Sequence, residues 1–354
     1  VRAIDHGLSF GKHGLPYMGS CDWNDGMSAI GEGGGESIWL GFFLILTIRS
    51  FLTITDGLKD ESAARYRDVL KALRASLEKC FEKDRYLRAF FADGTAVGAP
   101  GAPECEIDIL PQAFAALTAE TDEEKRRAKT ALMTATHLLF DEKHNIYKLF
   151  TPPFSGIGKY PGYIAGYVPG VRENGGQYTH GAIWGAIGLL EACYAEAGAS
   201  VLLSLAPTNA EKKPFYKAEP YYLCGDVYSS AGLEGRGGWS LYTGAAGWYF
   251  NAVVEHLLGI KEHKNGFILQ PRLSRLFSGF SFRFSRGQSE FLIVARLGNK
   301  YSCTMDGSEH DNFFLYDKNS HLIEITVECK NKDKPGEVEK PEKPKKTEKN
   351  EKSD

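Results

Sequence analysis

Two carboxylates lie close together in a glycine-flanked segment near the start of the sequence. The run His13–Met27 (HGLPYMGSCDWNDGM) places Asp22 and Asp25 on either side of Trp23 and Asn24. An indole offers a flat face for stacking a sugar ring, and an apolar neighbour raises the pKa of a carboxyl group, as general acid catalysis requires. Alternatively, the polar residues cap a turn and the tryptophan is a core residue.

A second segment, Gly166–His180 (GYVPGVRENGGQYTH), combines a base, an acid, an amide, aromatic residues and a histidine. Arg172 and Glu173 are suited to hold sugar hydroxyls by charge-assisted hydrogen bonds. His180 lies at the start of a predicted helix, where exposed N–H groups favour an anion. In the alternative interpretation, Arg172 and Glu173 pair with each other and His180 is structural.

A third segment, Gly235–Trp248 (GRGGWSLYTGAAGW), precedes a further predicted helix. The Thr243 hydroxyl and the Gly244 N–H would form a cradle for an oxyanion there. No lysine follows the glycines in the order of a P-loop. The alternative is a glycine turn that packs through Ala245 and Ala246.

The remaining composition argues against several other chemistries. No GxSxG supports a serine hydrolase, and the nine histidines show no HExxH or paired-ligand spacing, so we expect no metal. The seven cysteines form no CxxC pair, which favours a reducing compartment and a cytoplasmic location. A net charge of -3 suggests no nucleic-acid partner.

The elements that must position these segments are mainly helices. Apolar residues recur at helical spacing in ranges that are separated by long, glycine-rich loops: 37–57, 61–82, 106–119, 122–141, 177–197 and 244–259. After residue 261 the pattern changes to short alternating strands. A doubly wound sheet is therefore not expected.

Two stretches have unusual compositions. Ser37–Leu58 is the most apolar, but Arg49 interrupts it, so it is interpreted as a buried helix and not as a membrane span. Residues 330–354 are almost entirely Lys, Glu, Pro, Asp and Asn, and we expect them to be disordered.

Five segments together resemble glycoside hydrolase family 94, the cellobiose and chitobiose phosphorylases. They occur in the family's order, as GSCDWNDGM, GGGESIWLGFF, GYVPGVRENGGQYTH, EPYYLCGDVY and GRGGWSLYTGAAGW. All three of the chemical segments above are represented among them. The RENGG form is most similar to the phosphorylase-like region of cyclic β-1,2-glucan synthases and to 1,2-β-oligoglucan phosphorylases.

The resemblance implies a mainly α fold. Residues 1–260 would form the C-terminal half of an (α/α)6 barrel, 261–329 a small β-sandwich-like domain and 330–354 the charged tail. The family's N-terminal β-sandwich and the first half of its barrel have no counterpart in this sequence. Because half a barrel exposes apolar helix faces, we expect the chain alone to be inactive or poorly folded unless further polypeptide completes it.

The resemblance also implies inverting phosphorolysis of a β-linked glucose oligosaccharide. Inorganic phosphate would be the nucleophile and Asp25 the general acid, with neither metal nor cofactor and without membrane contact; relatives often dimerise. The residues that match sugar-binding positions are Trp23, Tyr167, Arg172 and Glu173. Those that match phosphate-binding positions are His180, Thr243 and Gly244.

Two alternatives stay open. An inverting hydrolase on the same barrel would need a second carboxylate to activate water, and Glu173 or Asp226 are candidates. The chain would otherwise be a non-catalytic carbohydrate-binding or chain-length region of a glucan synthase, or an inactive remnant.

Overall fold

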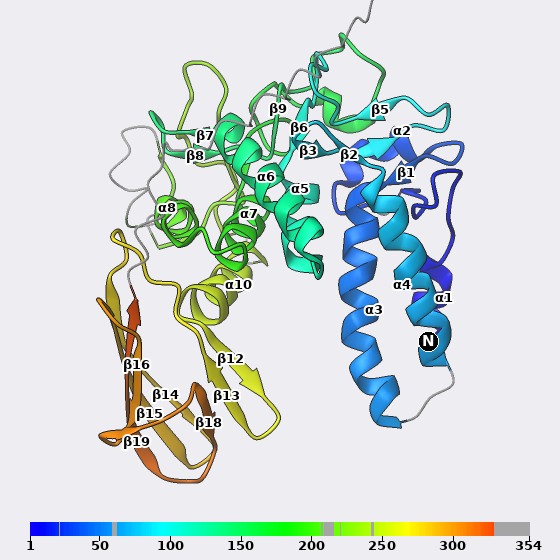
Figure 1. The fold of residues 1–354 in the computed structure, drawn as a ribbon. Helices are drawn as coiled ribbons and strands as arrows, with labels where there is room; N and C mark the ends of the chain where they lie inside the picture. The colour runs from blue at the N-terminus through cyan, green and yellow to red at the C-terminus, as the bar shows by residue number, and fades with distance from the viewer. Residues whose placement is uncertain are drawn as a thin grey trace, which may run out of the picture.

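The computed structural model describes residues 1–20, 22–58, 62–206, 208, 216–219, 221–241 and 244–328. Helices dominate the first part and strands the last (Figure 1). Consecutive long helices pack against each other as pairs: α3 (Ile38–Leu58) with α4 (Ser62–Glu78), α5 (Ile109–Thr118) with α6 (Asp122–Leu139), and α7 (Thr179–Glu191) with α8 (Ala195–Leu205). A further helix, α10 (Gly244–Asn251), continues as a π-helix over Ala252–Leu257 and packs on α7.

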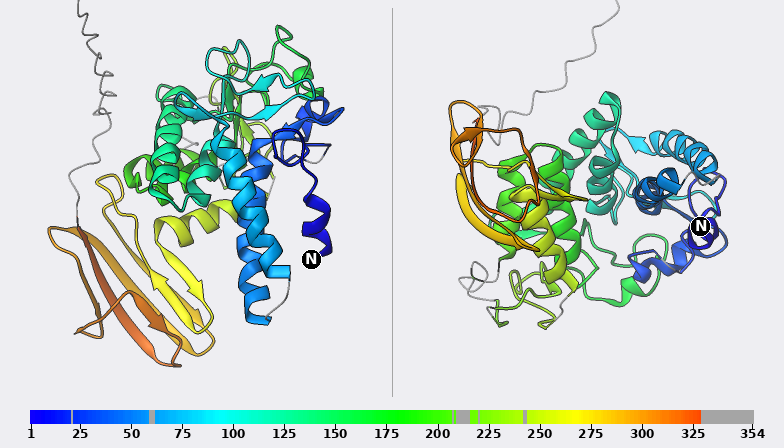
Figure 2. Two further views of the ribbon diagram at one scale, coloured as in Figure 1. Left: turned by 45° about the vertical axis from the view of Figure 1, so that its right-hand side comes forward. Right: turned by 90° about the horizontal axis from the view of Figure 1, so that it is seen from below.

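Three helices begin at one end of the molecule, each directly after a two-residue strand. Strand β1 (Glu36–Ser37) precedes α3, β6 (Ile107–Asp108) precedes α5, and β10 (Gln177–Tyr178) precedes α7. These strands pair with β4 (Ala89–Phe90), β9 (Phe150–Thr151) and β11 (Asp226–Val227) from the long loops. The glycine-rich loops therefore form a layer over the starts of these helices (Figures 1 and 2).

Local sequence explains where the second pair of helices begins and how closely α5 and α7 approach. Thr121 and Glu124 form a reciprocal capping box at the start of α6. On α7, a Cβ atom added at Gly188 would lie 3.0 Å from the Cα atom of Ala113 in α5. The small residue permits the contact between the two backbones, so α5 and α7 bury each other's apolar faces.

Helix α3 is the one described helix that is long and apolar enough to span a membrane. In this fold it packs into the core through one face, because Trp39, Phe42 and Ile48 are buried. Its other face exposes Phe43 and Ile54, with exposed fractions of 44% and 54%. The expected buried helix is thus covered on one side.

The β region has a core of its own. Strands β12 (Ile260–His263), β13 (Gly266–Leu269) and β18 (Phe313–Leu315) form one antiparallel sheet. A second sheet has the order β14-β15-β19-β16-β17, in which β15 (Ser289–Gly298) and β19 (Ser320–Glu328) run parallel. The remaining strands of this sheet are β14 (Gly279–Arg286), β16 (Ser302–Met305) and β17 (Ser308–Glu309). Apolar side chains from both sheets meet, among them Phe267, Phe291 and Phe314.

The division into helices followed by strands agrees with the sequence, but two helical predictions are wrong in detail. The single helix expected over 177–197 is split, since Cys193 adopts a positive φ of 68° and α8 continues to Leu205. The first 36 residues are rich in Gly, Asp and Ser, which predicts loop, but they contain α1 (Arg2–Gly7) and α2 (Ser28–Gly31). The predicted tail, 330–354, lies outside the described residues, and the boundary at residue 260 stays a prediction.

Candidate active site

The loop that carries Asp25 is shaped by buried polar neighbours. Asp22 and Asn24 are buried, and an oxygen of Asp22 accepts a hydrogen bond from the Asn24 backbone N–H at 3.0 Å. Asp25 then opens a short 3₁₀ turn, Asp25–Met27, and its side chain is exposed. The buried Asp22 and Asn24 thus fix the loop, and the carboxylate of Asp25 is accessible to solvent or to a ligand.

A tyrosine from a distant loop lies beside this carboxylate. Burial, together with the hydrogen bond and the charge of Asp25, raises the pKa of the Tyr163 hydroxyl well above its usual value. Gly162, with a φ of 129°, allows the approach, because a Cβ there would lie 2.5 Å from the Gly26 carbonyl oxygen. The Ala29 N–H also bonds the Pro161 carbonyl at 3.1 Å. Tyr163 lies outside the three motifs, four residues before the predicted Tyr167.

Arg172 lies between two aromatic rings. Its guanidinium carbon is 4.7 Å from the ring centre of Tyr167 and 4.1 Å from that of Trp239. Its Nε is 3.3 Å from Glu173, so the pairing considered as an alternative does occur. The oxygen that faces this Nε is Oε2 of Glu173, and it is buried. Both side chains of the motif thus belong to one aromatic and charged group.

Asp226 links the loop of Arg172 to the glycine-rich third segment, Gly235–Trp248. It is buried, and its two oxygens accept hydrogen bonds from the backbone N–H groups of Arg172 at 2.9 Å and of Trp239 at 3.2 Å. Burial raises the pKa of Asp226, while these two bonds act in the opposite direction. A carboxylate with both oxygens engaged in this way holds loops together.

His180 is surrounded by tryptophans. Its ring centre lies 4.2 Å from that of Trp184 and 5.7 Å from that of Trp248, and its Nδ1 atom is 3.4 Å from the indole nitrogen of Trp23. Burial lowers the pKa of His180 to about 4. The Nε2 atom is buried and has no hydrogen-bond partner within the described part of the chain.

The structure does not show the shielding of Asp25 that the motif led us to expect. Trp23 turns toward Tyr178, His180 and Trp184, with ring centres 5.3 to 5.5 Å apart. The ring therefore belongs to the cluster around His180, and Asp25 remains exposed. The aromatic residue that interacts with the acid is Tyr163.

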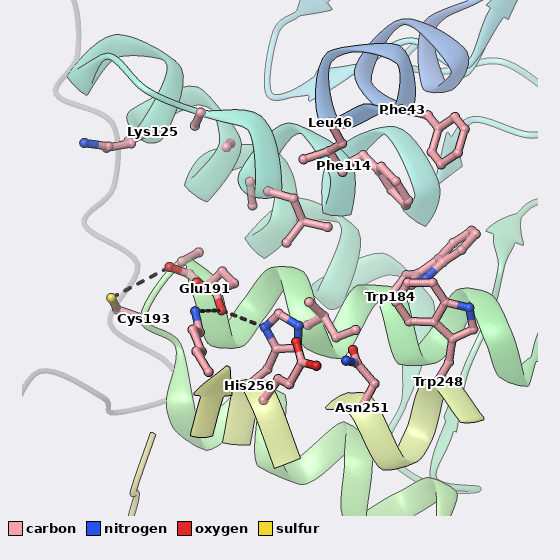
Figure 3. Close-up of a pocket in the computed structure, with 18 of the residues that line it drawn as sticks. Phe43, Leu46, Phe114, Lys125, Trp184, Glu191, Cys193, Trp248, Asn251 and His256 are labelled. Atoms are coloured by element: carbon pink, nitrogen blue, oxygen red, sulfur yellow. Dashed lines mark hydrogen bonds and ion pairs between the residues drawn. The ribbon is translucent and has the colours of Figure 1, made fainter. Parts of the chain in front are cut away.

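Gly244 is the first residue of α10 and lies one turn before Trp248. Because Trp248 contacts His180 near the start of α7, the start of α10 lies close to the start of α7. The N–H groups of a first helical turn have no acceptor within the helix and are free for an anion. Thr243 lies outside the described residues. Gly244, Trp184 and Trp248 line a cavity of about 1080 Å³ between α3 and α5 on one side and α7 and α10 on the other (Figure 3).

The predicted residues thus fall into two adjacent groups. Asp25, Tyr167, Arg172 and Glu173 belong to the loops, with Tyr163 as a link, since its ring centre is 6.1 Å from that of Tyr167. His180, Trp23 and Gly244 lie at the starts of α7 and α10, where Trp248 connects them. Trp23 stands two residues from Asp25, so one motif reaches both groups.

A family model matches the part of the chain that contains these residues. The model described as the glycosyl hydrolase 94 superfamily, catalytic domain, matches residues 1–259. The chain belongs to this family. The match covers the loop layer, the helices and all the candidate residues described above.

The chain is also similar in sequence to individual proteins of longer length. The chain is 39% identical over 290 residues to the cyclic beta-(1,2)-glucan synthase NdvB of Rhizobium meliloti, a match that covers 79% of the chain and 10% of the synthase. It is 27% identical to the solabiose phosphorylase of Paenibacillus borealis, over 90% of the chain and 43% of the phosphorylase. The chain thus spans less than half the length of the curated relatives it matches.

Among solved structures, the chain resembles a family 63 mannosylglycerate hydrolase from Thermus thermophilus. The TM-score is 0.41 and the sequence identity 14%, with 62% of this chain and 47% of that chain covered.

Proposed function

We propose that this chain supplies the general acid and part of the phosphate site of an enzyme that performs inverting phosphorolysis of β-glucosidic bonds. The observation that carries the proposal is the Trp23–His180 contact at 3.4 Å. It joins the loop of the exposed Asp25 to a partly buried histidine, whose buried Nε2 atom lacks a hydrogen-bond partner among the described residues. The phosphorylases among the relatives support the same reaction class.

In this reaction, a phosphate oxygen attacks the anomeric carbon while the bond from that carbon to the bridging oxygen breaks. Asp25 donates its proton to the bridging oxygen, which leaves as the hydroxyl of the second sugar, and solvent then reprotonates Asp25. The products are an α-sugar 1-phosphate and the shortened sugar. No second carboxylate is required, because phosphate takes the place of the activated water of a hydrolase.

The remaining residues bind the two substrates. His180 and the N–H of Gly244, with Thr243, would hold phosphate, and we propose that neither metal nor cofactor takes part. Trp23 and Tyr167 would contact the sugar ring, and Arg172 and Glu173 its hydroxyls. We propose a cytoplasmic β-linked glucose oligosaccharide as the substrate class, and a homodimer as the assembly.

We further propose that the chain is part of an (α/α)6 barrel that other polypeptide completes. Helices α3, α5, α7 and α10 face one apolar cavity, which includes Phe43, Phe114 and Trp248. Phe43 and Phe250 remain 44% and 67% exposed. Surfaces of this kind mark places where further structure packs. Without it, the chain should aggregate and lack activity.

The decisive experiment incubates the full-length protein with inorganic phosphate and a panel of β-linked glucose disaccharides and short β-1,2-glucans. We expect phosphate-dependent release of α-glucose 1-phosphate, and a rate that falls by roughly 10² to 10⁴ in Asp25→Asn. Free glucose formed without phosphate would replace the proposal with an inverting hydrolase. Sugar binding without any product would indicate a non-catalytic glucan-binding region.

A further inference from the structure

A fully buried arginine lies beneath the loop of Asp25. Arg88 directly precedes strand β4 and has an exposed fraction of 0%. Its Nη1 atom is 3.2 Å from Asp22 Oδ2, and its Nη2 atom contacts the other oxygen of the same carboxylate. The guanidinium thus grips Asp22 with two nitrogens, which fixes both the position and the orientation of the carboxylate.

The same guanidinium reaches the starts of two helices. Its Nε donates to Asp108 Oδ2 at 3.0 Å, and the other oxygen of Asp108 caps α5 by accepting from the Leu110 N–H at 2.8 Å. Its Nη1 also donates to the Ser37 hydroxyl at 3.2 Å. Ser37 in turn donates to Asp22 at 2.6 Å and accepts from the Leu40 N–H in the first turn of α3.

The charges in this network do not balance. One arginine faces two buried carboxylates, and Asp22 and Asp108 have exposed fractions of 4% and 1%. Burial would lower the pKa of Arg88, but the charges of Asp22 and Asp108 outweigh it and raise that pKa. Burial raises the pKa of Asp108 to about 6. A buried ionic group of this kind contributes little net stability compared with apolar packing, so its presence indicates another role.

We propose that Arg88 is a positioning residue for the general acid: through Asp22 it locks the loop of Asp25 to the starts of α3 and α5. Asp22 also accepts the Asn24 N–H, one residue before Asp25. The acid therefore projects from a loop whose base is held to two helices. This inference rests on the proposed function, because it assumes that Asp25 donates the proton.

Arg88→Lys tests the proposal in the full-length protein. Lysine retains the charge but cannot grip a carboxylate with two nitrogens and reach a second one. Phosphorolysis is measured with two substrates, an unactivated β-linked glucose disaccharide and 2,4-dinitrophenyl β-glucoside, whose leaving group departs without being protonated. We expect kcat for the disaccharide to fall by roughly 100-fold, and kcat for the aryl glucoside to change by less than about threefold.

Two further variants accompany it. Ser37→Ala removes one bond to Asp22 without leaving a charge unpaired, and it should show the same preference for the aryl glucoside with a smaller loss, even where Arg88→Lys fails to fold. Arg85→Lys is the matched control, since Arg85 is also buried and paired with Asp84 and Glu106 at 2.8 and 3.2 Å. Its ratio of the two rates should equal that of the unsubstituted protein.

Equal losses with both substrates in Arg88→Lys and Ser37→Ala would overturn the proposal, because a purely structural defect does not depend on the leaving group. Asp25→Asn is measured in parallel. If Asp25→Asn shows no preference for the aryl glucoside either, the proposed general acid is wrong and not only its positioning.

Discussion

The indole N–H of Trp23 donates a hydrogen bond to the Nδ1 atom of His180, with the nitrogens 3.4 Å apart. An indole nitrogen can only donate, so Nδ1 must be the acceptor. In the neutral ring the proton then resides on Nε2, which is buried without a hydrogen-bond partner among the described residues. The bond thus leaves the Nε2–H donor available to the phosphate that we propose as its ligand.

His180→Phe keeps an aromatic ring at this position and removes the Nε2–H donor. A hydrogen bond to a charged group contributes about 1.5–3 kcal/mol, so the KM for phosphate should rise by roughly 10- to 150-fold while the KM for the sugar changes little. Initial rates against phosphate concentration, at saturating sugar, measure the effect. His144→Phe is the control, because His144 pairs with Asp141 in a separate hairpin; a similar rise there would contradict a specific role for His180.

The charge state of His180 is a second prediction. Burial lowers its pKa to about 4, so the free protein holds it neutral above that pH. Its contribution to stability is present above the unfolded pKa of about 6.5 and is lost as the pH falls from there toward 4. NMR of the full-length protein labelled with ¹³C at histidine Cε1 should show one resonance, missing in His180→Phe, that does not titrate between pH 7 and 5. A midpoint near 6.5 would be incompatible with the buried environment.

Asp226→Asn distinguishes a loop anchor from a catalytic base. The amide oxygen can still accept one of the two backbone N–H groups, and leaving the other unsatisfied costs about 1–3 kcal/mol. We expect the KM for the sugar to rise by roughly 5- to 100-fold, since Arg172 and Trp239 lose their common anchor. The value of kcat should stay within about tenfold, whereas a loss of roughly 10² to 10⁴ would identify the base of a hydrolase.

Glu104→Gln should loosen the loop that leads to Tyr163. Glu104 accepts bonds from the N–H groups of Ser155, Ile157 and Gly158, and although burial alone would raise its pKa, these bonds lower it. Its stabilising effect is therefore present at neutral pH and is lost as the pH falls through the lowered pKa. Trypsin should cleave after Lys159 about tenfold faster in the variant, because local opening becomes easier.

Glu106→Gln is the control for this experiment. Glu106 pairs with Arg85 and accepts the Gly101 N–H, away from the 155–158 loop. Cleavage after Lys159 should proceed there as in the unsubstituted chain. The same acceleration in both variants would mean that Glu104 does not hold the loop.

The residues that could be predicted from sequence lie in contiguous motifs. Asp25, Arg172 and His180 each belong to a glycine-rich run whose composition differs from that of a helix, and the structure brings these runs together. The helices could be predicted for a similar reason, because the apolar spacing in α3 to α7 is a pattern of residues that are close in sequence. The break at Cys193 was missed, since a positive φ at a non-glycine residue leaves no compositional sign.

The supporting residues could not be predicted in this way. Arg88 is 66 residues from Asp22 and 20 from Asp108, and no spacing rule links them. Tyr163 stands in a loop with two other tyrosines, Tyr160 and Tyr167, and only the fold shows which one contacts Asp25. Contacts of this kind depend on loops that cross between helices, so they follow from the tertiary structure alone.

The π-helix at Ala252–Leu257 connects α10 to β12, the first strand of the C-terminal β region. At the end of the π-helix, Glu191 of α7 bonds His256 at 2.7 Å and Lys261 of β12 at 2.8 Å (Figure 3). These two bonds fix the position of the π-helix relative to α7 and to β12. Each residue of an α-helix turns the chain by about 100°. Deleting one residue of the π-helix before His256 would rotate Gly244 and Trp248 away from His180. The bonds of Glu191 to His256 and Lys261 would remain. The geometry at the proposed phosphate site therefore depends on chain length as well as on residue identity.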